Sequence, residues 1–125
     1  MRFIRFKLAG NTGLAVAHQG HYHGLLESSS DYPGDLHALL AQGGDALARA
    51  AAALARGPAL EAAQIDILPP LGRPGAIWCI GLNYADHSKE SGFEVPSYPA
   101  IFTRLASSLI GQGAPIVRPR VSTQL

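Results

Sequence analysis

The sequence predicts an α+β fold in which strands outnumber helices. Three observations support this prediction. Apolar and polar residues are interleaved in short segments over residues 1–26, which is typical of antiparallel strands. Two segments rich in alanine and leucine follow within residues 35–57 and favour helices. Short apolar runs bounded by proline and glycine then predict further strands in the second half.

The amino-terminal part is expected to begin as a small antiparallel meander. Strands are predicted over residues 2–7, 14–17 and 21–26, because each run is apolar or β-branched and ends at turn-forming residues. The predicted turns are Gly10–Gly13 and Gln19–Gly20.

Three histidines in this meander, His18, His21 and His23, have a spacing that suggests metal ligands. Residues two apart on a strand share a face, but His18 lies across the predicted turn. No cysteine or supporting acid is obvious nearby, whereas metal sites usually have such ligands and partners. We therefore interpret these residues as ordinary strand histidines.

Two helices are expected next. Asp35 is predicted to cap a helix that runs to about residue 42, and Asp45 to open a second helix over residues 46–56. Glycines end the first helix, and a Gly-Pro pair stops the second. A narrow apolar stripe on the second helix predicts that it covers a sheet, and the stripe consists of Leu47, Ala50, Ala51 and Leu54.

A domain boundary is predicted at Pro69–Pro70, which follows a short strand over residues 64–68. Residues 1–69 would form an appendage domain, and residues 70–125 would begin a second domain. In the second domain we expect a buried strand at Ile77–Ile80, a strand over residues 99–104 and a last short strand at Ile116–Val117. Cys79 would be a small buried residue of the first of these strands.

Composition excludes several classes of function. The 125 residues are 47% apolar, although twenty of them are alanines, and 15% are charged, with a net charge of +1. This low charge argues against nucleic acid or an anionic membrane surface as a partner. Charged residues interrupt the first seven positions, which excludes a signal peptide or a membrane span there, so we expect a cytoplasmic protein.

The segment after Ile80 carries the candidate chemistry. Gly81 ends the strand, Asn83 is a good helix N-cap, and Asp86 stands where a capping box has its acid. His87 and Glu90 are three residues apart and would share one helix face. Such a pair can act as a general base, although a solvated helix face would have the same spacing.

The sequence of this segment resembles a signature of the fumarylacetoacetate hydrolase family. The resemblance is strong over residues 65–125 and looser before them. It rests on the following segments: Gly81–His87 with Glu90, Pro99–Arg104, Ser107–Gly111 and Pro115–Pro119.

The resemblance implies the first strands of a mixed β-sandwich or roll, with His87 and Glu90 as catalytic residues. It also implies substrate contacts from Tyr84 and from Arg104, which stands where many members have lysine. A guanidinium suits an anionic substrate, while the alternative is a solvated arginine at a strand end. Residues 91–99 would form either a lid over the substrate or an ordinary surface loop.

A divalent cation, Mg²⁺ or Mn²⁺, is implied by the family, with carboxylate ligands. None of the nine carboxylates follows Glu94, and the family's ligands would lie beyond Leu125. We therefore expect no metal ligand in this chain. We expect it to be the front part of a longer enzyme, inactive alone, which would be a homodimer when full length.

The implied substrate is a small dicarboxylic or 2-oxo acid of the kind met in aromatic catabolism. The implied reaction is hydrolysis of a carbon–carbon bond, decarboxylation, or isomerisation of hydroxymuconate-type acids, which are hydrolase, lyase and isomerase chemistry. The alternative is an inactive remnant or an interaction module, because no catalytic constellation is found in residues 1–63.

Overall fold

The computed structural model of the protein describes residues 1–82, 90, 92 and 97–123. The chain divides into two compact units, one formed by Met1–Gly72 with Ile110–Leu125 and the other by Arg73–Leu109. We name them the amino-terminal unit and the hairpin unit and describe each by itself. The hairpin unit is an insertion in the chain between two segments of the amino-terminal unit.

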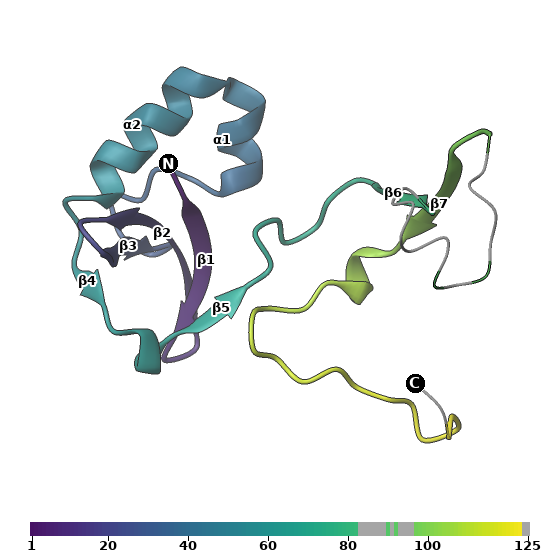
Figure 1. Ribbon diagram of the computed structural model, residues 1–125. Coiled ribbons are helices and arrows are strands. Elements are labelled where there is room, and N and C mark those ends of the chain that lie inside the picture. The colour runs from purple at the N-terminus through teal and green to yellow at the C-terminus, as the bar shows by residue number, and fades with distance from the viewer. Residues whose placement is uncertain (83–89, 91, 93–96, 124–125) are drawn as a thin grey trace. The chain divides into compact units, whose positions relative to one another are not determined.

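The amino-terminal unit contains a five-stranded antiparallel sheet with the strand order β4-β3-β2-β1-β5 (Figure 1). The first three strands are consecutive in the chain and form the predicted meander. Together with two helices this confirms the predicted α+β, mostly β class. The strand bounds are β1 (Phe3–Leu8), β2 (Asn11–His18), β3 (His21–Leu26), β4 (Ala59–Leu60) and β5 (Asp66–Leu68).

Two-residue turns join the first three strands. Ala9 and Gly10 have φ angles of 47° and 87°, and Gln19 and Gly20 have 49° and 84°. Positive φ at both central residues is the type I′ geometry, whose twist matches that of the strands. The expected turn at Gly10–Gly13 was therefore wrong, and β2 begins at Asn11 rather than at residue 14.

Two strand glycines make room for a buried aromatic ring on one face of this sheet. Phe6 is 1% exposed and lies in a small core with Ile4 and Ala15. A Cβ at Gly13 would come within 2.5 Å of the Phe6 ring, and one at Gly24 within 2.6 Å of the Ala15 Cβ. Both positions need glycine, because the Phe6 ring and the neighbouring strand occupy the space of a side chain at Gly13, and Ala15 and the Leu14 carbonyl oxygen occupy it at Gly24.

The helices α1 (Leu36–Gln42) and α2 (Gly44–Leu54) cover the other face of the sheet (Figure 1). This arrangement confirms the expectation that the second helix covers a sheet. The main core lies between the helices and the sheet. Its buried members are Leu14, Val16, Leu36, Leu39, Ala46, Ala50 and Leu54.

The helix starts agree only in part with the prediction. The Asp35 side chain accepts a hydrogen bond from the Ala38 backbone N–H at 3.0 Å, which confirms it as the N-cap of α1. The second cap was wrong, since α2 begins at Gly44 with Gly43 as its N-cap. Gly43 has a φ of 91°, so this one residue both ends α1 and starts α2. Asp45 instead lies in the first turn, where its negative charge interacts favourably with the positive end of the helix dipole and stabilises α2.

The remainder of this unit is less regular than predicted. A short 3₁₀ helix, η1 (Ala62–Gln64), precedes β5, so the strand expected over residues 64–68 begins only at Asp66. Ile116 and Val117 are 74% and 81% exposed and do not form the predicted last strand. None of the described strands pairs with them, and an isolated apolar dipeptide has no ladder to join.

The hairpin unit contains β6 (Ile77–Gly81) and β7 (Ala100–Arg104), which pair antiparallel, and the 3₁₀ helix η2 (Ala106–Ser108). The predicted strands are confirmed, but burial of Ile77–Ile80 is not. Trp78 and Ile80 are 70% and 57% exposed, while Ile77 and Cys79 are half-buried. A two-stranded sheet buries little, because no second layer among the described residues of this unit covers it.

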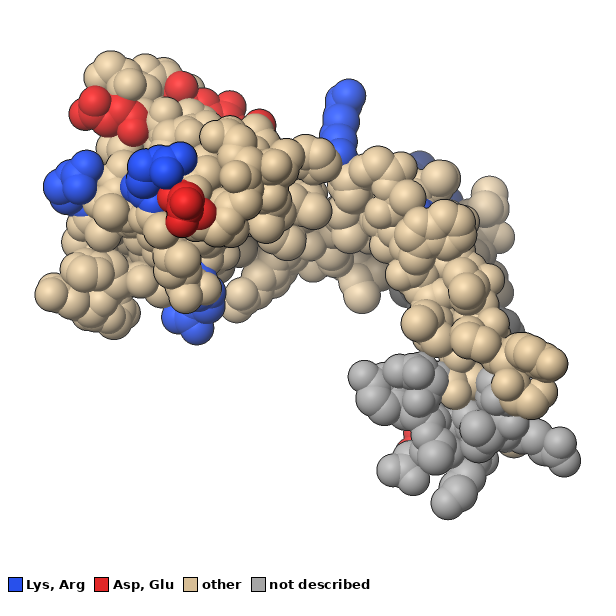
Figure 2. Space-filling model, turned by 90° about the horizontal axis from the view of Figure 1, so that it is seen from above, with Lys and Arg blue, Asp and Glu red and all other residues tan. Residues whose placement is uncertain are grey.

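On the face drawn in Figure 2, lysines and arginines stand singly or beside acids and form no large patch of one sign. No helix in the described part of the chain is long and apolar enough to cross a membrane.

Candidate functional site

The candidate site is built on the β6–β7 pair. The register places Gly81 opposite Ala100 at one end of the pair and Ile77 opposite Arg104 at the other. The connection between Gly81 and Ala100 holds the predicted base and the Tyr84 position. Arg104 is four residues along β7 from this connection, or about 13 Å at the usual rise of a strand.

The backbone changes direction where β6 ends. Leu82 has a φ of 51°, in the left-handed region that a residue with a branched side chain rarely adopts. That conformation costs about 1–2 kcal/mol, and backbone of this kind gathers at functional sites. The strained residue directly precedes the segment that carries the candidate base.

The predicted site residues are only partly within the described chain. Tyr84 and His87 lie outside the described residues, so their roles stay predictions. Glu90 is helical and exposed to solvent. Its pairing with His87 also stays a prediction.

Arg104 extends over the ring of Phe102, with its guanidinium carbon 5.1 Å from the ring centroid. Both side chains are exposed, and that of Phe102 is 41% exposed. Among the described residues, no hydrogen bond or ion pair occupies the Arg104 guanidinium. Its donors can therefore meet a carboxylate, the ligand that a guanidinium binds at two points.

Known proteins resemble this chain over its whole length. The sequence-family model named fumarylacetoacetate (FAA) hydrolase C-terminal matches residues 76–125. The mitochondrial oxaloacetate tautomerase FAHD2A of Homo sapiens is 34% identical over 130 aligned residues, which cover 100% of this chain and 41% of the human protein. The chain belongs to the fumarylacetoacetate hydrolase family.

Two other proteins are similar to parts of this chain. The mitochondrial oxaloacetate tautomerase of Rattus norvegicus is 39% identical over 87 residues, covering 69% of this chain and 28% of the relative. The uncharacterised protein MJ1656 of Methanocaldococcus jannaschii is 45% identical over 53 residues, which cover 42% of this chain and 22% of that protein. This family member thus spans about two fifths of the length of the human relative.

A metal site of the kind implied for the family is not formed by the described residues. Among them, no group of three or more His, Cys, Asp or Glu side chains could hold a metal ion. The His18 and His23 rings meet edge to face with centroids 5.7 Å apart. His23 Nδ1 lies 3.0 Å from the Gly57 carbonyl oxygen, so this histidine has a structural partner.

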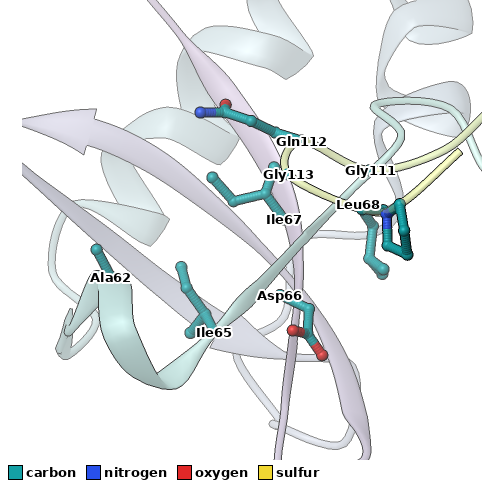
Figure 3. A pocket seen from close by; sticks show the side chains of 10 residues that line it. Ala62, Ile65, Asp66, Ile67, Leu68, Gly111, Gln112 and Gly113 are labelled. Atoms are coloured by element: carbon teal, nitrogen blue, oxygen red, sulfur yellow. The ribbon is translucent and has the colours of Figure 1, made fainter.

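A pocket of about 580 Å³ in the amino-terminal unit is no second site. Its wall is formed by η1 and β5 on one side and by residues 111–115 on the other (Figure 3). Asp66 and Gln112 supply its polar side chains, and they point in different directions. Binding pockets need polar groups that converge on a ligand, and this pocket lacks them.

Phe102 and Arg104 share a face of β7, as their spacing of two residues on one predicted strand indicates. The structure adds the contact between the guanidinium and the ring. Ser108 has a structural role at the end of η2, since its hydroxyl donates to the Leu105 carbonyl oxygen at 2.7 Å.

Proposed function

We propose that this chain supplies the base-bearing part of an enzyme that interconverts the keto and enol forms of oxaloacetate or a closely related 2-oxo dicarboxylic acid. One observation carries the proposal: relatives named as oxaloacetate tautomerases align with the whole chain, the human one at 34% identity. The chain spans 41% of that relative, so the activity is proposed for the protein as a whole.

The reaction is a proton transfer, which suits a histidine base held by a carboxylate. In the keto-to-enol direction, the His87 imidazole removes a proton from the carbon next to the carbonyl. The C–H electron pair forms the carbon–carbon double bond, the carbonyl π pair moves to the oxygen, and the oxygen takes a proton from water to become the enol hydroxyl. The imidazolium then returns its proton to water, which restores the base. Glu90 orients the imidazole and stabilises its protonated form.

Arg104 binds a substrate carboxylate through guanidinium donors that no other described residue occupies, and Tyr84 completes the substrate contacts. The arginine begins about 13 Å of strand from the connection, so its long side chain must span part of that distance to reach the substrate. A dicarboxylate suits this residue, because it offers the guanidinium an anionic group that can be bound at two points. The Mg²⁺ or Mn²⁺ ion and the homodimer stay predictions.

A second candidate, a non-catalytic interaction module, is favoured by the exposed apolar face of the hairpin. Trp78, Ile80 and Ile101 are 70%, 57% and 61% exposed and lie on one face of the β6–β7 pair. Such a face can contact another protein without any chemistry.

The decisive experiment measures conversion of enol oxaloacetate to the keto form by ultraviolet absorbance in the natural protein. Arg104→Ala should raise KM for oxaloacetate about tenfold or more, because a charge-assisted hydrogen bond to the carboxylate is lost. Arg49→Ala, at an exposed position on α2, is the matched control. A natural protein without activity on oxaloacetate would favour the interaction module, and an unchanged KM would remove Arg104 from the site.

A further inference from the structure

The face of the hairpin that carries Arg104 differs from its opposite face. Cross-strand partners share a face, so the pairs Ile77–Arg104, Cys79–Phe102 and Gly81–Ala100 lie on one side of the β6–β7 pair. Arg104 is the sole charged side chain of the described residues in these strands.

Phe102 lies between Arg104 and the end of β6. The guanidinium carbon of Arg104 is 5.1 Å from the centre of the Phe102 ring, within the range at which a cation is attracted to an aromatic face. On the other side, a Cβ built at Gly81 would lie 3.6 Å from the Phe102 ring, which is ordinary contact distance. The ring therefore reaches along the face towards the residue where the candidate catalytic segment begins.

We propose that Phe102 is a positioning residue, which holds the Arg104 guanidinium for binding of a substrate carboxylate. This inference rests on the proposed function of Arg104. An exposed arginine side chain samples many rotamers, and a bound carboxylate must fix it at a cost in conformational entropy. Contact with the ring restricts the guanidinium before the substrate arrives and lowers that cost.

The chemistry of the pair explains why an arginine suits this position. A planar guanidinium can contact an aromatic ring with its face while its N–H groups remain available to a carboxylate. A phenyl ring accepts no conventional hydrogen bond, so it holds the cation without competing for those donors. An acidic partner would also orient the guanidinium, but it would occupy the donors that the substrate needs.

The test compares variants of Phe102 and Arg104 in the natural protein. Phe102→Leu should raise KM for oxaloacetate about two- to fivefold, the scale of an exposed cation–π contact, with kcat unchanged. Phe102→Tyr keeps the aromatic ring, so this variant should have the same KM as the natural protein. Trp78→Leu removes an aromatic ring from the opposite face of the same hairpin and should leave KM unchanged.

A double-mutant cycle and a spectroscopic signal separate positioning from a general structural effect. In an Arg104→Met background, Phe102→Leu should cause no further change in KM, because the guanidinium is gone. The NMR resonance of the Arg104 Nε–H group should move in Phe102→Leu, since the ring current is lost, and should stay in Trp78→Leu. If Phe102→Leu does not fold, Phe102→Met takes its place in both measurements.

The outcomes distinguish the two proposals. If Arg104→Met raises KM but Phe102→Leu changes neither KM nor the Arg104 resonance, positioning by the ring is overturned and the role of Arg104 stands. If the resonance moves but Arg104→Met leaves KM unchanged, the proposed role of Arg104 fails, and the positioning role falls with it.

Discussion

The two units use the same antiparallel pairing but differ in what covers it. The amino-terminal unit contains every buried apolar residue of the described chain, all of them between Ile4 and Leu54 and on the two faces of its sheet. In the hairpin unit, the described strand residues are exposed or half-buried. The candidate chemistry belongs to the second unit and the apolar core to the first. Stability and activity should therefore respond to different mutations.

The largest effect should come from the predicted base in the hairpin unit. His87→Ala should lower turnover of oxaloacetate in the natural protein by about 10²- to 10⁴-fold, the usual scale for losing a general base, and Glu90→Gln should lower it in the same direction. His37→Ala, at an exposed position on α1 of the other unit, is the control and should keep full turnover. Near-normal turnover of the His87 variant would contradict the dyad.

A matched pair of leucines tests the difference in burial. Leu54 is 0% exposed on α2, and Leu105 is 76% exposed beyond β7. Leu54→Ala should lower the free energy of unfolding by about 2–5 kcal/mol, because it leaves a cavity. Leu105→Ala should change it by less than about 0.5 kcal/mol. Denaturant titration of both variants measures this, and equal losses would mean that Leu105 is covered in solution.

Within the amino-terminal unit, the cap of α1 should contribute a smaller amount. Asp35→Ala removes the acceptor of the Ala38 N–H and should cost about 1 kcal/mol of unfolding free energy. Asp35→Asn keeps a capping oxygen and should retain most of the stability. Asp45→Ala, which removes a carboxylate that makes no cap, should cost less than Asp35→Ala in the same denaturant titration.

The smallest effect concerns Tyr32, which contacts the main core. Burial, reinforced by the negative charges of Glu27 and Asp35, raises the pKa of its phenol from 10.0 to about 12. A raised pKa in the folded state means that the contribution to stability is complete below about pH 10 and is lost as the pH rises towards 12.

Spectrophotometric titration should show one tyrosine that ionises late, and Tyr32→Phe should remove that step. The same substitution should also reduce the loss of stability between pH 10 and 12. A late step that persists in Tyr32→Phe would assign the raised pKa to a different tyrosine.

Local chemistry explains which predictions from the sequence were confirmed. The meander, the Asp35 cap and the two hairpin strands each depend on residues close together in the chain. The errors in this group are errors of turn geometry. Ala9 and Gly43 sit at the ends of elements, where a residue or two decides whether a tight turn or a longer loop forms.

The candidate site was predicted as a list of residues rather than as a geometry. The sequence of the segment from Gly81 to Glu90 resembled the family, and the comparisons confirm that the chain belongs to it. The pairing that places Arg104 opposite Ile77 and Phe102 opposite Cys79 depends on the register between β6 and β7. Register is a relation between two strands that are separated by the 18 residues 82–99, and no local pattern contains it.

The sequence alone determined the secondary structure class, the position of the main strands and the family. Only the tertiary structure decided burial: the same kind of apolar run is enclosed in β2 and exposed in β6. The physical reason is that an apolar side chain favours burial wherever it lies, but it becomes buried only when another layer packs against its face. For β2 this layer is α2, which packs against the strand. The sequence of β2 alone does not indicate that a helix will pack there.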